Sequence, residues 1–392
     1  MPPETDQATH PPVLIEATAL SRLFDALHAH GYTIVGPTVR DGAIVVAELE
    51  SASELPYGVG VDTEAGRYRL RARADNAAFG HSAGPQSWKT VLHPARAPLW
   101  SADRSTDGTV VVHEPVERHR YALFGVRPCD LAAIGILDRV LAGGRHADPV
   151  YAGRRDGNLI IAVECTEPGA TCFCTSMGTG PHAGSGFDLA MTEMLNGDEH
   201  RFLVRAGTPA GERILAEIPQ RPADDASIGQ ASAAVADAAT HMGRTMPAQG
   251  LPDLLAASHQ SPHWDDVASR CLTCGNCTMV CPTCFCTSTE DVTDLTGDHA
   301  ERWRRWDSCF DLDFSYLHGG SVRTSGQARY RQWITHKLGT WHDQFGSSGC
   351  VGCGRCIAWC PTGIDITQEV AALSLLQLAA DSVDPAEDEA AR

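Results

Sequence analysis

The chain has 392 residues, of which 43% are hydrophobic and 20% charged, so it can bury one large core or two ordinary ones. Its formal net charge of -18 at pH 7 argues against a nucleic-acid partner, which requires a basic face. The opening residues, MPPETDQATHPP, lack the charged and apolar regions of an export signal, and no apolar stretch reaches the roughly 18 to 20 residues that span a bilayer. We therefore expect a cytoplasmic protein with no nucleic-acid and no membrane partner.

The predicted elements begin after a Pro-rich segment. Residues 1–12 and the acidic residues 381–392 contain few large apolar side chains, and we expect both segments to be disordered. Apolar residues recur at helical spacing from Ile15 to about Leu27. Gly and Asp turns then separate three stretches that are typical of strands, which are residues 32–36, 43–49 and 67–73.

The stretch from Tyr121 to Ser176 predicts a βαβ unit, because YALFGV and NLIIAVE are typical of strands and DLAAIGILDRVL of the helix between them. The two strands are then parallel and end at the same edge of the sheet, where α/β proteins bind ligands. Cys129 follows the first strand and Cys165 the second. We expect these thiols to lie close together, with Cys172 and Cys174 in the loop just beyond.

Four thiols at one sheet edge favour an iron–sulfur cluster, because four thiolates are a typical ligand set for a [4Fe-4S] cluster. Redox chemistry of the thiols is one alternative, and Cys129 is predicted to lie at a helix N-terminus, where the dipole lowers a thiol pKa. Simple burial of unreactive thiols is the other alternative.

The C-terminal third contains two identical cysteine runs, each of the form C-x2-C-x2-C-x3-C-P, which is the run of bacterial ferredoxins. In that pattern the fourth cysteine of each run binds the other cluster. The pattern therefore predicts one [4Fe-4S] cluster on Cys271, Cys274, Cys277 and Cys360, and a second on Cys281, Cys350, Cys353 and Cys356. The four-cysteine site described above would then hold a third [4Fe-4S] cluster.

Zinc is the alternative metal for such runs, but zinc ribbons pair two C-x2-C knuckles and need neither the third and fourth cysteine nor the proline. The remaining cysteines, Cys284, Cys286 and Cys309, have no obvious fourth partner. They are interpreted either as further ligands or as buried structural thiols, with a role in handling sulfur as a third hypothesis.

The sequence as a whole predicts an α+β protein. An α/β domain over residues 13–250 contains the βαβ unit and ends in Ala-rich helical segments, and a mainly helical, ferredoxin-like 4Fe-4S dicluster domain covers residues 251–380. No Rossmann, P-loop, nucleophile-elbow or zincin motif is present, so we expect no nucleotide, flavin or hydrolytic site and no catalytic residue. Iron–sulfur clusters alone then suggest electron transfer.

Five strings of the sequence carry a family resemblance, and they stand in the order FGVRPCDLAAI, ECTEPGATCFCTSMGTG, CLTCGNCTMVCPTCFC, RRWDSC and GCVGCGRCIAWCPTGIDI. In these strings the chain resembles the beta, iron–sulfur subunit of cytosolic NAD(P)-dependent [NiFe] hydrogenases, also called sulfhydrogenases. Over the same motifs it is also similar to one of the subunits of anaerobic sulfite reductase.

The resemblance implies a protein that relays electrons between the small and large subunits of a [NiFe] hydrogenase and a further subunit, which binds flavin and NAD(P). It implies that the eight cysteines of the two runs are cluster ligands. The alternative function is electron transfer in an anaerobic sulfite or polysulfide reductase.

Overall fold

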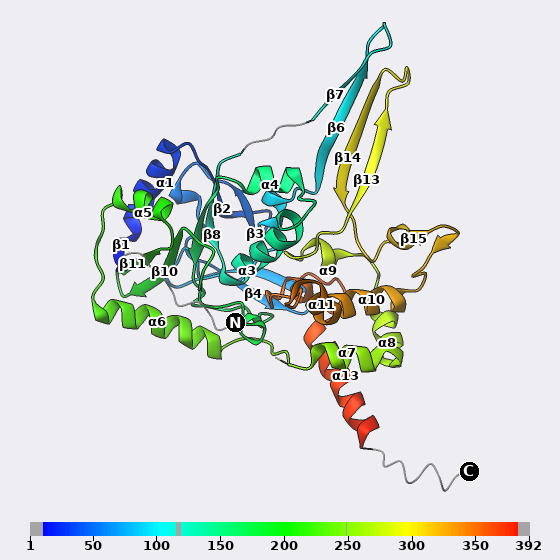
Figure 1. The fold of residues 1–392 in the computed structure, drawn as a ribbon. Coiled ribbons are helices and arrows are strands. Elements are labelled where there is room, and N and C mark those ends of the chain that lie inside the picture. The colour runs from blue at the N-terminus through cyan, green and yellow to red at the C-terminus, as the bar shows by residue number, and fades with distance from the viewer. Residues whose placement is uncertain (1–10, 115–118, 248, 383–392) are drawn as a thin grey trace.

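The computed structural model describes residues 11–114, 119–247 and 249–382. Disorder is predicted for residues 1–12 and 381–392. Most of these two segments, namely residues 1–10 and 383–392, lies outside the described residues. The structure is a mixed α/β fold, in which a large sheet packs beside a helical region, and a narrow arm projects from the body (Figure 1).

The large sheet has eight strands in the order β12-β1-β11-β10-β9-β8-β2-β3. The strands β2, β8, β9 and β10 are parallel neighbours, and the other pairs are antiparallel. Every residue of the central strands β8 and β9 is buried, as expected for parallel strands covered on both faces. The strands are β1 (Val13–Glu16), β2 (Thr33–Arg40), β3 (Ala43–Glu48), β8 (Tyr121–Val126), β9 (Leu159–Val163), β10 (Leu189–Asn196), β11 (Glu199–Ala206) and β12 (Arg221–Pro222).

Helices cover both faces of this sheet. Phe124 of β8 packs with α1 (Leu20–Ala29) and α5 (Pro209–Ala216) on one face. Leu123, which points the opposite way, packs with α3 (Pro128–Leu137), α4 (Pro149–Arg155) and α2 (Lys89–Leu92) on the other. The helix α6 (Asp225–Thr240) covers that second face near β10 and β11.

The predicted βαβ unit is present as β8, α3 and β9, with β8 and β9 parallel. The strands predicted at residues 32–36, 43–49 and 67–73 correspond to β2, β3 and β5 (Arg67–Ala72), and β5 pairs with β4 (Val59–Glu64). The helix expected from Ile15 begins only at Leu20, because Ile15 pairs with Phe202 in the sheet instead.

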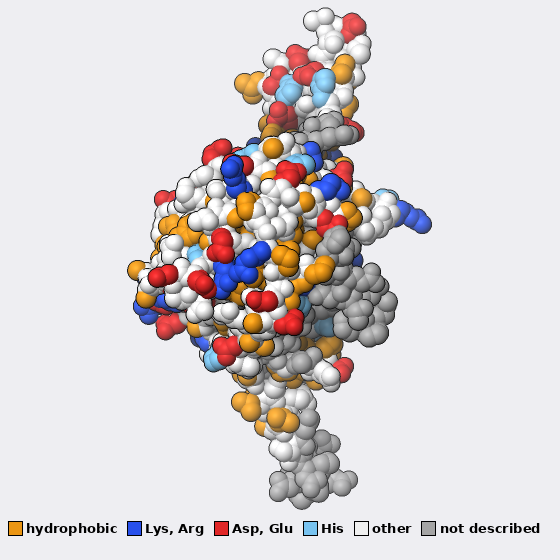
Figure 2. All heavy atoms as spheres, turned by 90° about the vertical axis from the view of Figure 1, so that its left-hand side faces the viewer, with side chains coloured by type: hydrophobic (Ala, Val, Ile, Leu, Met, Phe, Trp, Pro, Cys, Tyr) orange, Lys and Arg blue, Asp and Glu red, His pale blue; other side chains and the backbone are white. Residues whose placement is uncertain are grey.

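The arm is a four-stranded antiparallel sheet built from two distant parts of the chain. The strands β6 (Arg96–Arg104) and β7 (Val110–His113) come from the N-terminal half, whereas β13 (Thr287–Thr293) and β14 (His299–Trp306) lie between the two cysteine runs. The strand β14 pairs with β6 and so joins the two halves. Figure 2 shows the arm standing clear of the body, with acidic and histidine side chains on its surface.

The remaining residues form the helical region, whose core includes the buried Trp264, Phe310 and Trp333. Its last helix extends away from the body and exposes Leu375, Leu376 and Leu378 (Figures 1 and 2). The helices are α7 (Leu251–Ala257), α8 (His263–Arg270), α9 (Asn276–Met279), α10 (Gly326–Thr335), α11 (Trp341–Phe345), α12 (Arg355–Ala358) and α13 (Ile366–Asp381), and β15 (Tyr316–Leu317) pairs with β16 (Gly320–Ser321). Short turns are η1 (Ala17–Ala19), η2 (Ala52–Glu54), η4 (Cys174–Met177), η5 (Ser258–Gln260) and η6 (Asp313–Ser315), and π-helical turns are η3 (Asp138–Ala142) and η7 (His336–Thr340).

Candidate metal centre

The first group of thiols surrounds a cavity at the end of α8. Its thiol lining includes the four cysteines that the sequence assigns to the first cluster, Cys271, Cys274, Cys277 and Cys360, together with Cys356. Backbone N–H groups already point at two of the sulfurs: Thr273 N lies 3.3 Å from Cys271 Sγ, and Ile364 N lies 3.3 Å from Cys360 Sγ. Amide groups aimed at ligand sulfurs are a regular feature of iron–sulfur sites.

The second group is more deeply buried. Burial raises the pKa of the Cys350 thiol to about 12, and Cys353 and Cys281 are among its electrostatic neighbours. Burial also raises the pKa of Cys356 well above its usual range, and Cys350, Cys353 and Cys281 add to that shift. The structure thus brings Cys281 to the second run and Cys360 to the first, which is the exchange of fourth cysteines that the motif predicts.

The third group forms where β8 and β9 end. Cys129 is in the first turn of α3, Cys165 follows β9, Cys174 begins η4, and Cys172 lies two residues before it. Burial raises the pKa of Cys172 to about 12, with Cys165 adding to the shift, and burial with Asp130 and Cys174 raises that of Cys129. The four thiols converge as the βαβ argument predicts.

The third group packs against the second cysteine run. Phe173 N donates to Gly352 O at 2.8 Å, and Cys172 Sγ lies 3.8 Å from Cys353 O. Gly352 has a φ of +65°, and a Cβ there would lie 2.6 Å from Cys174 Cα. Only glycine allows the two cysteine loops to approach this closely.

Two unpartnered polar groups show that the first cavity suits an iron–sulfur cluster. The hydroxyl of Tyr330 and the indole N–H of Trp333 are buried without a hydrogen-bond partner among the described residues, and both side chains line the cavity. Buried donors without acceptors are rare and need an explanation. The sulfurs of a cluster accept hydrogen bonds, so a cluster held by the surrounding thiols fits these donors.

The spacing of the cysteines does not suit a single ion such as zinc. Zinc bound at about 2.3 Å by tetrahedral thiolates requires sulfurs roughly 4 Å apart. Within the described residues, the one group spaced for a single ion is His263, Asp266 and Glu369, and no set of cysteines has such spacing. A cluster does not require its thiols to lie that close together, because its ligands bind different iron atoms.

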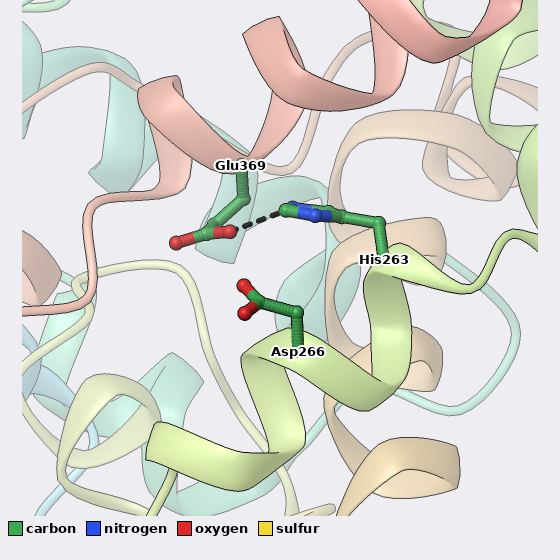
Figure 3. A group of neighbouring side chains, drawn as sticks. All are labelled: His263, Asp266 and Glu369. Atoms are coloured by element: carbon green, nitrogen blue, oxygen red, sulfur yellow. Dashed lines mark hydrogen bonds and ion pairs between the residues drawn. The ribbon is translucent and has the colours of Figure 1, made fainter.

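The group His263, Asp266 and Glu369 is an ion-pair network rather than a metal site (Figure 3). His263 Nε2 lies 2.7 Å from Glu369 Oε2, and Arg270 Nη2 lies 2.9 Å from Asp266 and 3.1 Å from Glu369. The guanidinium therefore already supplies the positive charge that the carboxylates need. The network ties α13 to α8 and holds the residue that precedes Cys271.

Sequence reasoning missed the charged residues that contact the thiol groups. Lys337 Nζ lies 3.3 Å from Cys281 Sγ, and Lys89 Nζ lies 3.0 Å from Cys284 O. Arg355 forms a buried bidentate pair with Asp130 at 2.8 and 2.9 Å. Arg355 and Asp130 each adjoin a cysteine in the chain, which is a signal that the sequence offered, whereas Lys89 and Lys337 lie far from any cysteine motif.

These thiol groups define an iron–sulfur protein, and comparison with known proteins agrees. Residues 270–364 match the family model of the 4Fe-4S dicluster domain, which establishes [4Fe-4S] clusters as the cofactor class. The chain is 35% identical over 250 residues to sulfhydrogenase 2 subunit beta of Pyrococcus furiosus, and the match covers 63% of this chain and 72% of that subunit. The chain belongs to the family of sulfhydrogenase beta subunits, as the resemblance predicted. No solved structure matches it.

Proposed function

We propose that the chain is an iron–sulfur subunit that relays electrons between a [NiFe] hydrogenase module and a flavin and NAD(P)-binding subunit. The observation that supports this function is a continuous series of thiol groups. Cys353 of the second group is an electrostatic neighbour of Cys129 and Cys172 in the third, and Cys356 is a neighbour of Cys277 in the first. The series ends at Cys274, which is exposed.

In this proposal twelve cysteines hold three [4Fe-4S] clusters, which when bound supply one-electron carriers. The protein's own groups bind, shield and tune them. Phe310, Tyr330 and Trp333 cover the first group with aromatic surface and exclude water, while Arg355 and Lys337 place positive charge beside thiolates. The exposed edge at Cys274 offers a short path between the first cluster and a partner protein.

The proposal is tested on the purified full chain and on its complex. The twelve cysteines should account for about 12 iron and about 12 acid-labile sulfide per chain. The chain alone should show no hydrogen-dependent dye reduction, and subunits that contain nickel and flavin should co-purify with it. Zinc in place of iron, or hydrogenase activity of the isolated chain, would overturn the proposal.

The third cluster has its own test. Replacing Cys165 with Ser should lower the iron content by about four per chain, because one ligand of that site is lost. Thr175→Ala is the matched control, since Thr175 is an exposed residue of the same loop and carries no thiol. Equal iron content in Cys165→Ser and the parent protein would show that the third cluster is absent.

The alternative function, electron transfer to a sulfite or polysulfide reductase, predicts a different partner. It draws on Cys284, Cys286 and Cys309, which lie outside the three groups above. Mass spectrometry of the native complex separates the two functions, because a sulfite reductase would contribute siroheme and a hydrogenase would contribute nickel.

A further inference from the structure

Three cysteines outside the three groups converge at the base of the arm. Cys284 and Cys286 lie just before β13, and Cys309 follows β14. Asp307 N donates to Cys286 O at 2.9 Å, which continues the pairing of β13 with β14 and brings the two ends of the hairpin together. Burial raises the pKa of Cys309 to about 12, and Cys286 is its strongest electrostatic neighbour.

Two buried lysines flank these cysteines, and each is only 3% exposed. Lys337 Nζ contacts Thr283 Oγ1 at 2.9 Å, Gly349 O at 3.0 Å and Cys281 Sγ at 3.3 Å. Lys89 Nζ contacts the carbonyl oxygens of Cys284, Met279 and Thr278 at 3.0 to 3.4 Å and lies 3.9 Å above the ring of Trp306.

Neither lysine forms an ion pair with a carboxylate among the described residues. Burying an ammonium group away from water is strongly unfavourable unless negative charge lies nearby. The acidic groups that adjoin both lysines are thiols, and Cys281, Cys284 and Cys286 interact electrostatically with each of them. A cluster on the second group would supply negative charge to Lys337 through Cys281 and Cys350, whereas Lys89 lies against the backbone of Cys284, which belongs to none of the three groups.

From this arrangement we propose that Cys284, Cys286 and Cys309 hold a further iron–sulfur cluster, beside Lys89 and Lys337. A disulfide would remove the negative charge that the lysines need, and all three cysteines are free. A single metal ion does not fit, because no set of cysteines in the described part of the chain has the required spacing. Three thiolates suffice for a three-iron cluster, or for a four-iron cluster whose last iron binds a non-protein ligand.

The position of this site connects it to the electron relay, and in this respect the inference rests on the proposed function. Cys309 is the strongest electrostatic neighbour of Cys277 in the first group, and Cys284 is an electrostatic neighbour of Cys281 in the second. The further cluster would therefore lie beside both clusters of the dicluster domain. All fifteen cysteines of the chain then act as ligands.

Native mass spectrometry of the anaerobically purified full chain tests the proposal without any substitution. We expect about 15 or 16 iron atoms per chain, which is three or four more than three cubanes contain. A chain that holds about 12 overturns the further cluster and leaves the proposed function intact. A chain without iron or sulfide overturns the proposed function instead.

Replacing Cys284, Cys286 and Cys309 together with Ser should remove about three or four iron atoms and leave the electron paramagnetic resonance signals of the reduced dicluster unchanged. Ser308→Ala is the matched control, because Ser308 is buried beside Cys309 and bonds to Thr278 Oγ1 but carries no thiol. Iron content equal to that of the parent protein overturns the proposal. If the triple variant does not fold, the native mass of the parent chain still shows whether the further cluster is present.

Discussion

Lys337 is a buried charge in direct contact with a predicted cluster ligand, since its Nζ lies 3.3 Å from Cys281 Sγ. A hydrogen bond to a charged group contributes roughly 1.5 to 3 kcal/mol. Reduction adds negative charge to a cluster, so the ammonium favours the reduced state. Replacing Lys337 with Met should shift the midpoint potential of the second cluster to more negative values by about 60 mV or more, since about 59 mV corresponds to a tenfold change for one electron.

A redox titration monitored by electron paramagnetic resonance measures this shift. Arg22→Met is the control, because Arg22 is a cation of α1 whose side chain is 70% exposed, and water screens its charge. The control should titrate with the parent potentials. Equal midpoint potentials of the second cluster in Lys337→Met and in the parent protein would contradict the proposed effect of the ammonium group.

At this scale the sequence predicted the thiol groups and missed the lysines. The spacing of Cys271, Cys274 and Cys277 is set by the chain itself, so a pattern of letters suffices to find a cluster loop. Lys89 reaches the carbonyl of Cys284 from a helix almost two hundred residues earlier, through packing that no local pattern encodes. Whether each thiol binds iron remains a prediction.

Among the elements, the arm contains a contact that depends on pH. His299 of β14 lies 2.7 Å from Asp103 of β6 through Nδ1 and 3.0 Å from Glu301 through Nε2. The hydrogen bond to Asp103, and then that to Glu301, raises the pKa of His299 above its usual value of 6.5. A raised pKa means that the stabilisation is complete below about pH 6.5 and is lost as the pH rises through the folded-state pKa.

We therefore expect amide hydrogens of β6 and β14 near this contact to exchange faster, after correction for intrinsic rates, as the pH rises above 6.5. Hydrogen exchange with mass spectrometry measures this, and His299→Gln should weaken the pH dependence. Because this exposed contact lies in the arm, the exchange rates of strands in the large sheet should not change with pH in the same way. Equal pH dependence in the variant and the parent protein would refute the role of His299.

A second element-scale contact joins α3 to α12 through Asp130 and Arg355, whose side chains are 4% and 3% exposed. Removing one partner of such a pair leaves an unpaired buried charge and destabilises a protein by about 3 to 5 kcal/mol. We expect this loss in Asp130→Asn, measured by urea unfolding. Replacing Arg355 with Met in the same chain should recover part of it.

Asp25→Asn is the control for this pair, because Asp25 forms an exposed ion pair with Arg22 on α1 and should contribute little. An unfolding free energy of Asp130→Asn close to that of the control would show that the buried pair does not stabilise the fold.

Among the elements, those with a continuous local pattern were predictable. The βαβ unit follows from two apolar runs around one helix, and it is present. The arm was not predicted, because pairing of β6 with β14 depends on a contact between residues about two hundred positions apart. The dicluster region was expected to be mainly helical, yet β13 and β14 lie between its two cysteine runs.

At the scale of the whole molecule, the two predicted domains share contacts that neither can make alone. The strand β14 pairs with β6, and Arg304 of β14 forms an ion pair with Asp148 at the start of α4. The loop of Gly354 lies against the loop of the third thiol group, and a Cβ on Gly354 would be 2.4 Å from Thr171 O.

Within the described residues, no helix is both long and apolar enough to cross a membrane.

The division near residue 250 therefore remains a prediction about where the chain changes character, and the contacts predict how the halves behave. Residues 1–250 expressed alone should lack cooperative unfolding, because β6 would become an unpaired edge and Asp130 would be buried without Arg355. Residues 251–392 alone should bind less iron than the same segment does in the full chain. Co-expression of the two halves should restore the iron content and the cooperative transition, because the shared strand pairing can then form. Circular dichroism during thermal unfolding measures the cooperative transition, and iron analysis measures the iron content. A cooperative transition in isolated residues 1–250 would show that this half is an independent domain, and it would contradict the view that the two halves depend on each other to fold.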